Sequence, residues 1–408
     1  MLVLSGYVKD DFSTIYKDFN FKNKYLITSK KNIKPGKLKE LRQVFTEIIG
    51  VEEYYDSCQV EWAAIDLHKR VRFNRIITPA TGEFDIIRAA KLRKYLAIDG
   101  QDPKSACAFR DKALMKTMLS RAEVKTPSFQ KVTSTVDLLK FIEIYGLPVV
   151  VKPRFGVASL NTQIHFTSKD VESFLNRPDV SFEKQKMMVE TYVEGEMFHV
   201  DGLVFNGKVI AWPSIYVGTA MDMVNGKFFA NHLLSSENPL VPKLVNYAKK
   251  ILSILPTPKM TAFHLELFKN KSGELIFCEI ASRAGGGYTS SIWNAAFDIP
   301  LREAFYLIQA GINVDQYEKE LHPKIIPASV VIPKQTGTID RIEQSCPLSF
   351  VSRYVTFYSA GEKTQKSSDT MNPIASALLL GKSEKDITKK INQFLHWASQ
   401  NIYYQQSR

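Results

Sequence analysis

Two glutamates, Glu266 and Glu279, stand in neighbouring runs of alternating apolar and polar residues that flank Ser272 and Gly273. This pattern predicts a β-hairpin with a two-residue loop. With Ser272 and Gly273 as the loop, Glu266 lies directly opposite Glu279 in a non-hydrogen-bonded pair, where side chains are closest. Like charges in that position destabilise a hairpin unless they share a cation or a proton. The pair therefore predicts an oxygen-ligand site for Mg²⁺ or Mn²⁺.

The same register predicts further contacts along the hairpin. Phe268 should face Phe277 on the side of the glutamates, and Leu267 should face Cys278 on the core side. His264 shares the face of the first glutamate by strand alternation, although a purely structural role for it stays open. A longer loop would shift the register and turn one glutamate towards solvent. The hairpin alone leaves this alternative open.

Two lysines occupy positions that suit an anionic partner. Lys152 follows a buried β-branched run and precedes a loop at 154–159. A lysine at the carboxyl end of a strand can meet a phosphate at the mouth of a sheet. Lys112 stands in the first turn of a predicted helix over 111–122, where a cation is unfavourable unless an anion lies nearby. Either lysine would also fit a solvated surface position.

Two glycine-containing segments could bind a ligand through the backbone. Residues 190–196, ETYVEGE, are typical of a strand that breaks at Gly195 and resumes, which presents main-chain groups to a planar ligand or forms an ordinary β-bulge. Arg283 precedes the glycines at 285–287, which lead into a predicted helix over about 290–297. Such a turn favours an anion near the helix N-terminus, and a flexible surface turn is the alternative.

The elements that position these residues follow from hydrophobic runs. Short buried runs at 2–4, 25–27 and 75–77 alternate with polar or helical stretches and predict an open α/β unit. The chain lacks a GxGxxG motif, which argues against a dinucleotide-binding Rossmann site. Later segments predict helices at 136–145, at 168–176 and after 385, and strands at 187–190, 198–205, 330–332 and 354–356.

Composition narrows the class of protein. The 408 residues, 45% hydrophobic and 24% charged, are typical of a globular protein with two or three domains. No apolar run approaches the roughly 20 residues that span a bilayer, so we expect a cytoplasmic protein. The net charge of +12 is spread thinly, which favours a phosphate-rich small ligand over nucleic acid. The four cysteines are far apart, which predicts free thiols.

The order of the motifs, DK at 111, VVVKP at 149, VETYVEGE at 189, HLELF at 264 and CEIASRAGGG at 278, resembles the ATP-grasp superfamily of carboxylate–amine or carboxylate–thiol ligases. The resemblance is close over about residues 105–310. It implies an α/β (α+β) ATP-grasp fold, with an N-terminal open α/β domain at 1–105, a small lobe at 106–188, a large lobe with the metal and substrate site at 189–310, and a small C-terminal α+β cap at 311–408.

The resemblance also implies a role for each candidate residue. For ATP, Lys112 and Lys152 would contact the phosphates under a mobile cover at 154–159 that includes Ser159, while Glu190, Thr191, Tyr192 and Val193 would bind adenine and Glu196 the ribose. For chemistry, Glu266 and Glu279 would hold Mg²⁺ (or Mn²⁺), Arg283 and Lys152 would be catalytic, and His264, Arg283, Gly286 and Gly287 would contact substrate.

Two positions depart from the family pattern. The loop at 154–159 contains only Gly156, where the family is richer in glycine, and this puts closure of the loop over the phosphates in doubt. Ala281 stands where many members have Asn, so one magnesium ion would have fewer protein ligands.

The segment EIASRAGGG is closest in appearance to the L-amino-acid ligases that make dipeptides. This resemblance implies transfer of a phosphoryl group from ATP to a carboxylate, then attack by an amine on the acyl phosphate. Expected partners are small carboxylates and amines, amino acids foremost, without nucleic acid or membrane, and a homodimer is common among the resembling proteins. Two alternatives stay open: a ligase or carboxylase acting on a non-amino-acid carboxylate, and a non-catalytic ATP-binding regulatory protein.

Overall fold

The computed structural model describes the chain except for residues 9–11, 18, 80–82, 368–371 and 406–408. Its N-terminal unit contains a parallel sheet in the order β3-β2-β1-β4, as the alternating runs predict for an open α/β unit. The strands are β1 (Leu2–Ser5), β2 (Tyr25–Ser29), β3 (Glu47–Val51) and β4 (Ile76–Ile77), and the helices are α1 (Phe12–Lys17), α2 (Pro35–Leu41), α3 (Gln59–Val71), α4 (Glu83–Tyr95) and α5 (Pro103–Ala108).

A second, antiparallel sheet forms the small lobe in the order β5-β8-β6-β7. Its strands are β5 (Phe129–Lys131), β6 (Val149–Pro153), β7 (Gln163–His165) and β8 (Met187–Thr191), with α6 (Lys112–Arg121), α7 (Thr135–Tyr145), α8 (Ser168–Leu175) and α9 (Phe182–Gln185). Local capping explains why α6 and α7 begin where the sequence predicts. Asp111 accepts two backbone N–H bonds at the start of α6, and Ser134 with Asp137 forms a capping box on α7.

An eight-stranded sheet in the order β13-β12-β9-β10-β11-β14-β18-β16 forms the largest part of the molecule. Its strands are β9 (Gly195–Phe205), β10 (Lys208–Val217), β11 (Phe229–Leu233), β12 (Met260–Asn270), β13 (Leu275–Ala281), β14 (Ile326–Ile332), β16 (Val351–Thr356) and β18 (Ala375–Gly381). Strands β14, β16 and β18 thus extend the same sheet as the hairpin of β12 and β13, whereas the other strands after residue 311, in the order β17-β15-β19, form a separate small sheet. The expected boundary between 188 and 189 falls inside β8.

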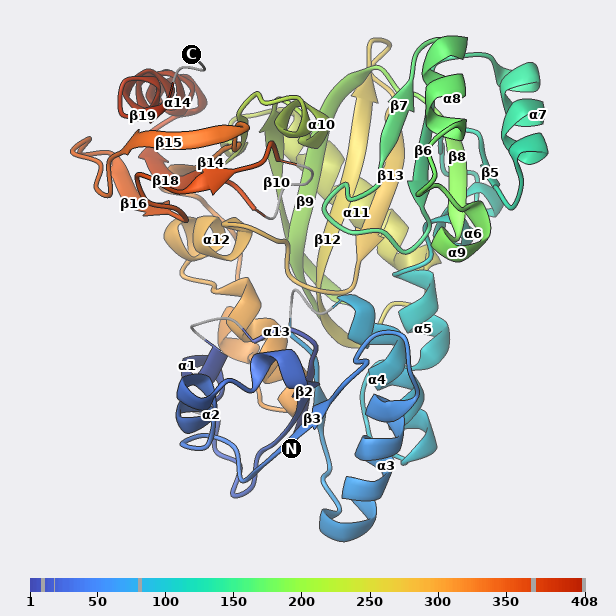
Figure 1. Cartoon of the computed structure of the whole chain (residues 1–408), viewed down its shortest axis with the longest axis vertical. Coiled ribbons are helices and arrows are strands. Elements are labelled where there is room, and N and C mark those ends of the chain that lie inside the picture. The colour runs from blue at the N-terminus through green and yellow to red at the C-terminus, as the bar shows by residue number, and fades with distance from the viewer. Residues whose placement is uncertain (9–11, 18, 80–82, 368–371, 406–408) are drawn as a thin grey trace.

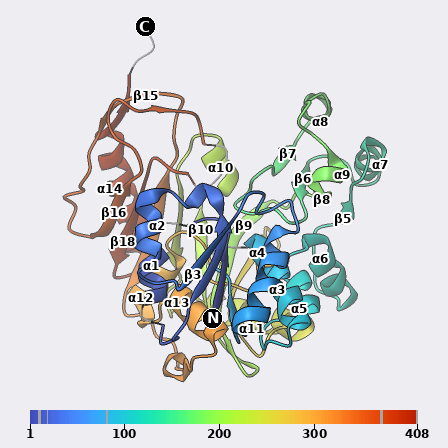
Figure 2. The ribbon, with the colours of Figure 1, turned by 60° about the horizontal axis from the view of Figure 1, so that its bottom comes forward.

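Helices join these layers into one body. In Figure 1 the N-terminal unit lies below the large sheet, with the small lobe and the C-terminal strands on opposite sides. Figure 2 shows the parallel strands of the N-terminal unit in front of the large sheet, between the small lobe and the C-terminal strands. The remaining elements are α10 (Ala220–Val224), α11 (Leu240–Ile254), α12 (Thr289–Phe297), α13 (Leu301–Ala310), α14 (Glu384–Ser399), β15 (Gly337–Ile342), β17 (Lys363–Thr364), β19 (Ile402–Tyr404) and the 3₁₀ turns Lys30–Asn32 and Asp315–Tyr317.

The core that supports the site is shared between units. Helix α13 contacts both β12 of the large sheet and β4 of the parallel sheet, while α11 packs on β10 and β9. One buried cluster runs from Val3 and Leu26 to Leu265, Trp293 and Phe305, so the N-terminal unit and the large sheet bury apolar surface against each other. Among the described residues, no helix combines the length and apolar character that a membrane crossing requires.

Candidate active site

The hairpin of β12 and β13 places Glu266 directly opposite Glu279, as the sequence predicts. The predicted two-residue loop, from which that pairing was inferred, is nevertheless wrong. The Asn270 N–H bonds to the Glu274 carbonyl around a three-residue loop, with Gly273 at a φ of 82°. The register then shifts by one residue beside Cys278. The extra loop residue and the β-bulge cancel, and the glutamates still meet.

The bulge changes the pairs between the glutamates and the turn. Leu267 lies opposite Phe277, and Phe268 lies opposite Ile276, so the predicted pairs of Phe268 with Phe277 and of Leu267 with Cys278 are wrong.

The potential ligand atoms of Cys278 and the two glutamates lie within 4.8 Å of one another. Burial raises the pKa of the Cys278 thiol to about 12, so the thiol stays protonated near neutral pH.

The two carboxylates have different neighbours. The Tyr216 hydroxyl donates to Glu266 Oε1 over 2.7 Å, and His264 Nε2 lies 3.5 Å from the same oxygen. Lys112 Nζ lies 3.1 Å from Glu279 Oε2. Burial alone would raise the pKa of Glu279, but Lys112 and Lys152 lower it to about 2. An ionised carboxylate beside a second one is the oxygen donor set that Mg²⁺ accepts, while the buried Ala281 adds no ligand.

Lys112 and Lys152 each already contact a carboxylate. The Lys112 ammonium also donates to the Gly156 carbonyl over 2.8 Å, which ties the start of α6 to the loop at 154–159. Lys152 Nζ lies 2.6 Å from Glu190 Oε1. Burial would lower the pKa of Lys152, but Glu190 raises it above its ordinary value, so Lys152 remains charged.

The predicted adenine segment is the connection between two sheets. Strand β8 ends at Thr191 and β9 begins at Gly195, so the prediction of one strand that breaks at Gly195 and resumes is wrong. A Cβ at Gly195 would lie 2.3 Å from the Lys269 carbonyl, so close strand packing requires glycine there. Three residues, including Val193, cross between the lobes, and the Tyr192 N–H bonds to the Pro148 carbonyl.

The side chains of this segment do not gather at one point. The Glu190 carboxylate is buried between Lys152 and Lys116, and its backbone lies between those of β5 and β6 in the sheet. Glu196, the expected ribose contact, lies on the exposed start of β9, where its Oε2 is 2.6 Å from Lys269 Nζ. The loop at 154–159, the expected phosphate cover, includes Ala158 and Ser159 with φ values of 50° and 59°, a left-handed backbone that glycine adopts more easily.

Arg283 is held by an acid from the N-terminal unit that the sequence reasoning missed. Its Nε lies 2.6 Å from Glu83 Oε1, at the start of α4, and Nη1 donates to the Ala284 carbonyl. Glu83 also pairs with Arg110. Burial would raise the pKa of Glu83, but Arg283 and Arg110 keep it below its usual range. No local pattern marks Glu83, because its partner is 200 residues away.

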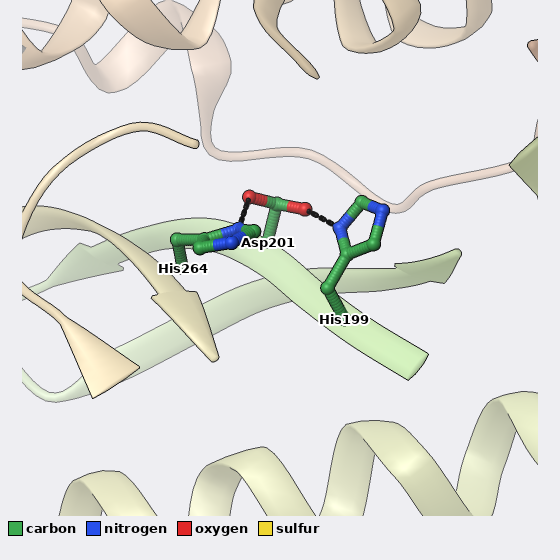
Figure 3. Close-up of side chains that lie close together, drawn as sticks. All are labelled: His199, Asp201 and His264. Atoms are coloured by element: carbon green, nitrogen blue, oxygen red, sulfur yellow. Dashed lines mark hydrogen bonds and ion pairs between the residues drawn. The ribbon is translucent and has the colours of Figure 1, made fainter. Parts of the chain in front are cut away.

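Figure 3 shows a second buried group beside Glu266, made of His199, Asp201 and His264. Asp201 accepts from His264 Nδ1 at 2.8 Å and lies 2.5 Å from His199 Nδ1. Burial would lower the pKa of His264, but Asp201 and Glu266 raise it to about 10. The sequence reasoning missed Asp201, although strand alternation places it on the face of His199 and so offered a signal.

The glycine turn lies against this group. A Cβ on Gly285 would come within 2.7 Å of Asp201 Oδ1, whereas Gly286 and Gly287 face open space. The Thr289 N–H and hydroxyl both donate to the Gly286 carbonyl where α12 begins. His264 and the turn are therefore close to each other through Asp201, and Glu266 borders the same place.

The chain is similar in sequence to known proteins. Residues 109–292 match the RimK-like ATP-grasp domain. The L-arginine-specific L-amino acid ligase of Bacillus subtilis is 25% identical over 352 residues, which cover 83% of this chain and 82% of that protein.

Two solved structures share the fold. The L-amino acid ligase from Bacillus licheniformis superposes with a TM-score of 0.78 at 17% identity, over 99% of this chain and 98% of the other. The biotin carboxylase domain of Hydrogenobacter thermophilus 2-oxoglutarate carboxylase, solved with MgADP, gives a TM-score of 0.68 at 16% identity, over 99% and 90%. At these identities the two likenesses show the fold alone.

Proposed function

We propose that this ATP-grasp enzyme, a carboxylate–amine ligase that uses ATP and Mg²⁺, takes amino acids as both its carboxylate and its amine substrate. Its product would then be a dipeptide. The similarity to an L-amino acid ligase over most of both chains supports this substrate class. The observation that carries the proposal is the ionised Glu279 opposite Glu266, with Lys112 alongside.

The proposed reaction has two group transfers. A carboxylate oxygen of the first amino acid attacks the γ-phosphorus of ATP, and ADP leaves. The amine nitrogen of the second amino acid then attacks the carbonyl carbon of the acyl phosphate, loses a proton, and expels inorganic phosphate. Glu266 and Glu279 would hold Mg²⁺, which would supply positive charge to neutralise the phosphates. The chain itself contributes positioning and fixed positive charge, and no covalent intermediate with a side chain is required.

Each residue of the site has a place in this scheme. Lys112 and Lys152 would bind phosphate oxygens from two sides, with Ser159 in the loop above them. The backbone of 190–193 would bind adenine, and Glu196 would reach the ribose after leaving Lys269. Arg283 would exchange its contact with Glu83 for the transferred phosphoryl group. His264, Gly286 and Gly287 would contact the amino-acid substrates at the glycine turn.

A screen of amino-acid pairs, followed by ADP release and by mass detection of dipeptides, tests the proposal. We expect Glu279→Gln to lower the rate of ADP release by at least about a hundredfold, because it removes a carboxylate of the pair that would hold Mg²⁺ at the phosphates. Glu274→Gln is the matched control, since Glu274 lies on the same hairpin but at its exposed tip.

Three outcomes count against the proposal in different ways. Unchanged ADP release in Glu279→Gln would show that the metal assignment is wrong. ADP release that responds only to a carboxylate other than an amino acid would favour another ATP-grasp ligase or a carboxylase. Nucleotide binding without turnover for any substrate would favour an ATP-binding regulatory protein.

A further inference from the structure

Lys116, in the second turn of α6, is a fully buried lysine (0% exposed) that the proposed reaction does not use. Its ammonium donates to the Cys278 carbonyl over 2.7 Å and lies 3.4 Å from the Phe277 carbonyl. It also lies 3.3 Å from Glu190 Oε2, and 5.4 Å from the centre of the Phe277 ring. Lys116 therefore touches both the metal hairpin and the strand that leads into the connection between lobes.

Burial of an ammonium group costs free energy unless it is paired and hydrogen-bonded. Burial lowers the pKa of Lys116, while the Glu190 carboxylate opposes that change. One carboxylate and a backbone carbonyl at 2.7 Å together replace its water. A buried lysine with these partners is placed for a structural reason rather than as a solvated surface charge.

The carbonyl that Lys116 contacts belongs to the extra residue of the bulge. A bulge leaves that residue outside the regular ladder of the strand pair, so its backbone groups need other partners. Cys278 immediately precedes Glu279, and the register shift at Cys278 is what brings Glu279 opposite Glu266. The contact from Lys116 therefore acts at the point where the geometry of the two carboxylates is decided.

We infer that Lys116 is a positioning residue, which holds the bulge at Cys278 and thereby sets Glu279 opposite Glu266 for the cation. The inference rests on the proposed metal site. The same ammonium joins this hairpin to Glu190 on β8, so the metal carboxylates and the start of the interlobe connection are held by one side chain.

Binding of Mn²⁺ alone, followed by electron paramagnetic resonance without nucleotide or substrate, tests this role. We expect Lys116→Met to weaken Mn²⁺ binding about tenfold or more, as loss of a supporting contact behind a metal ligand does elsewhere. Lys125→Met is the matched control. The Lys125 side chain is exposed and its ammonium pairs with Glu274 at the tip of the same hairpin. The bond from the Phe277 N–H to the Lys125 backbone carbonyl does not involve the substituted side chain, so Mn²⁺ binding should stay within twofold of wild type.

A second variant covers the case in which Lys116→Met does not fold. Lys116→Gln keeps a side-chain donor without a buried charge, and we expect its Mn²⁺ affinity to lie between those of Lys116→Met and the wild type. Thermal denaturation identifies the folded variants. A folded Lys116→Met or Lys116→Gln chain that binds Mn²⁺ within twofold of wild type would overturn the inference, whatever its stability.

Glu279→Gln separates this inference from the proposed function. If Glu279→Gln binds Mn²⁺ as the wild type does, the metal site itself is wrong. If Glu279→Gln loses Mn²⁺ binding while the folded Lys116 variants keep it, only the role of Lys116 is wrong. Loss in both, with binding retained in Lys125→Met, supports the inference.

Discussion

The hairpin of β12 and β13 and the end of β8 carry opposite excesses of charge. On the hairpin, Glu266 and Glu279 face each other, and Lys112 forms an ion pair with the second of them. At the end of β8, Glu190 lies between Lys116 and Lys152. One region thus has carboxylates in excess and the other has ammonium groups in excess. These opposite excesses fit the proposal that Mg²⁺ binds in the first region and nucleotide phosphates in the second.

The largest expected effect comes from removing the acid of the lysine-rich region. Glu190→Gln leaves Lys152 and Lys116 buried without a carboxylate between them, and we expect a loss of about 3–5 kcal/mol in the free energy of unfolding. Urea denaturation measures it. Glu172→Gln, at an exposed position on α8, is the control. A loss below about 1 kcal/mol for Glu190→Gln would show that the lysines do not depend on that charge.

The next effect is a pH dependence of the free energy of unfolding, which arises from His264 beside Glu266. The pKa of His264 is raised to about 10 by Asp201 and Glu266, so protonated His264 stabilises the fold fully below about pH 6.5, and this stabilisation is lost as the pH rises towards 10. Asp201→Asn removes the principal cause of this raised pKa. We expect the difference in unfolding free energy between wild type and Asp201→Asn to shrink by more than about 1 kcal/mol from pH 6.5 to pH 9.5.

The control for this pH effect is Asp222→Asn. Asp222 caps α10 and pairs with Lys227, and it has no histidine among these partners. The stability difference from wild type should therefore be almost the same at both pH values. An equal change with pH in Asp201→Asn and Asp222→Asn would rule out His264 as the source.

Another effect on stability distinguishes two glycines of the turn, Gly285 and Gly286. Gly285→Ala places a Cβ 2.7 Å from Asp201 Oδ1 and should cost about 1–3 kcal/mol of stability. Gly286→Ala enters open space and should change stability by less than about 0.5 kcal/mol. Thermal denaturation of the two variants compares them directly. Equal stability would mean that the turn does not pack on Asp201.

The smallest effect concerns the loop at 154–159, whose Gly156 carbonyl accepts a hydrogen bond from Lys112. Ala158 has a φ of 50°, a left-handed conformation that costs an L-residue about 1–2 kcal/mol. Because glycine adds flexibility to the unfolded chain, we expect Ala158→Gly to stabilise the protein by no more than about 1 kcal/mol. Val157→Gly, at a neighbouring residue outside the left-handed region, should destabilise it. Urea denaturation that shows a loss in both variants would contradict the strain at Ala158.

Local patterns predicted most elements that build the site. The helix at 112–121 follows from Asp111 as its N-cap, and the strand at 149–153 follows from its β-branched run. The connection at 192–194 was misread as part of one strand, because a change from one sheet to another has no local signature. The same limit hid the membership of β14, β16 and β18 in the large sheet.

Residue types and spacing by themselves determined which side chains could hold a cation and phosphates, since alternation and the order of motifs are local properties of the chain. Only the tertiary structure decided their geometry. Glu266 meets Glu279 because a longer loop is offset by a bulge at Cys278, and the carbonyl of that bulge is bonded by Lys116, 162 residues away. Contacts over such separations depend on how sheets and helices pack, and no local pattern encodes them.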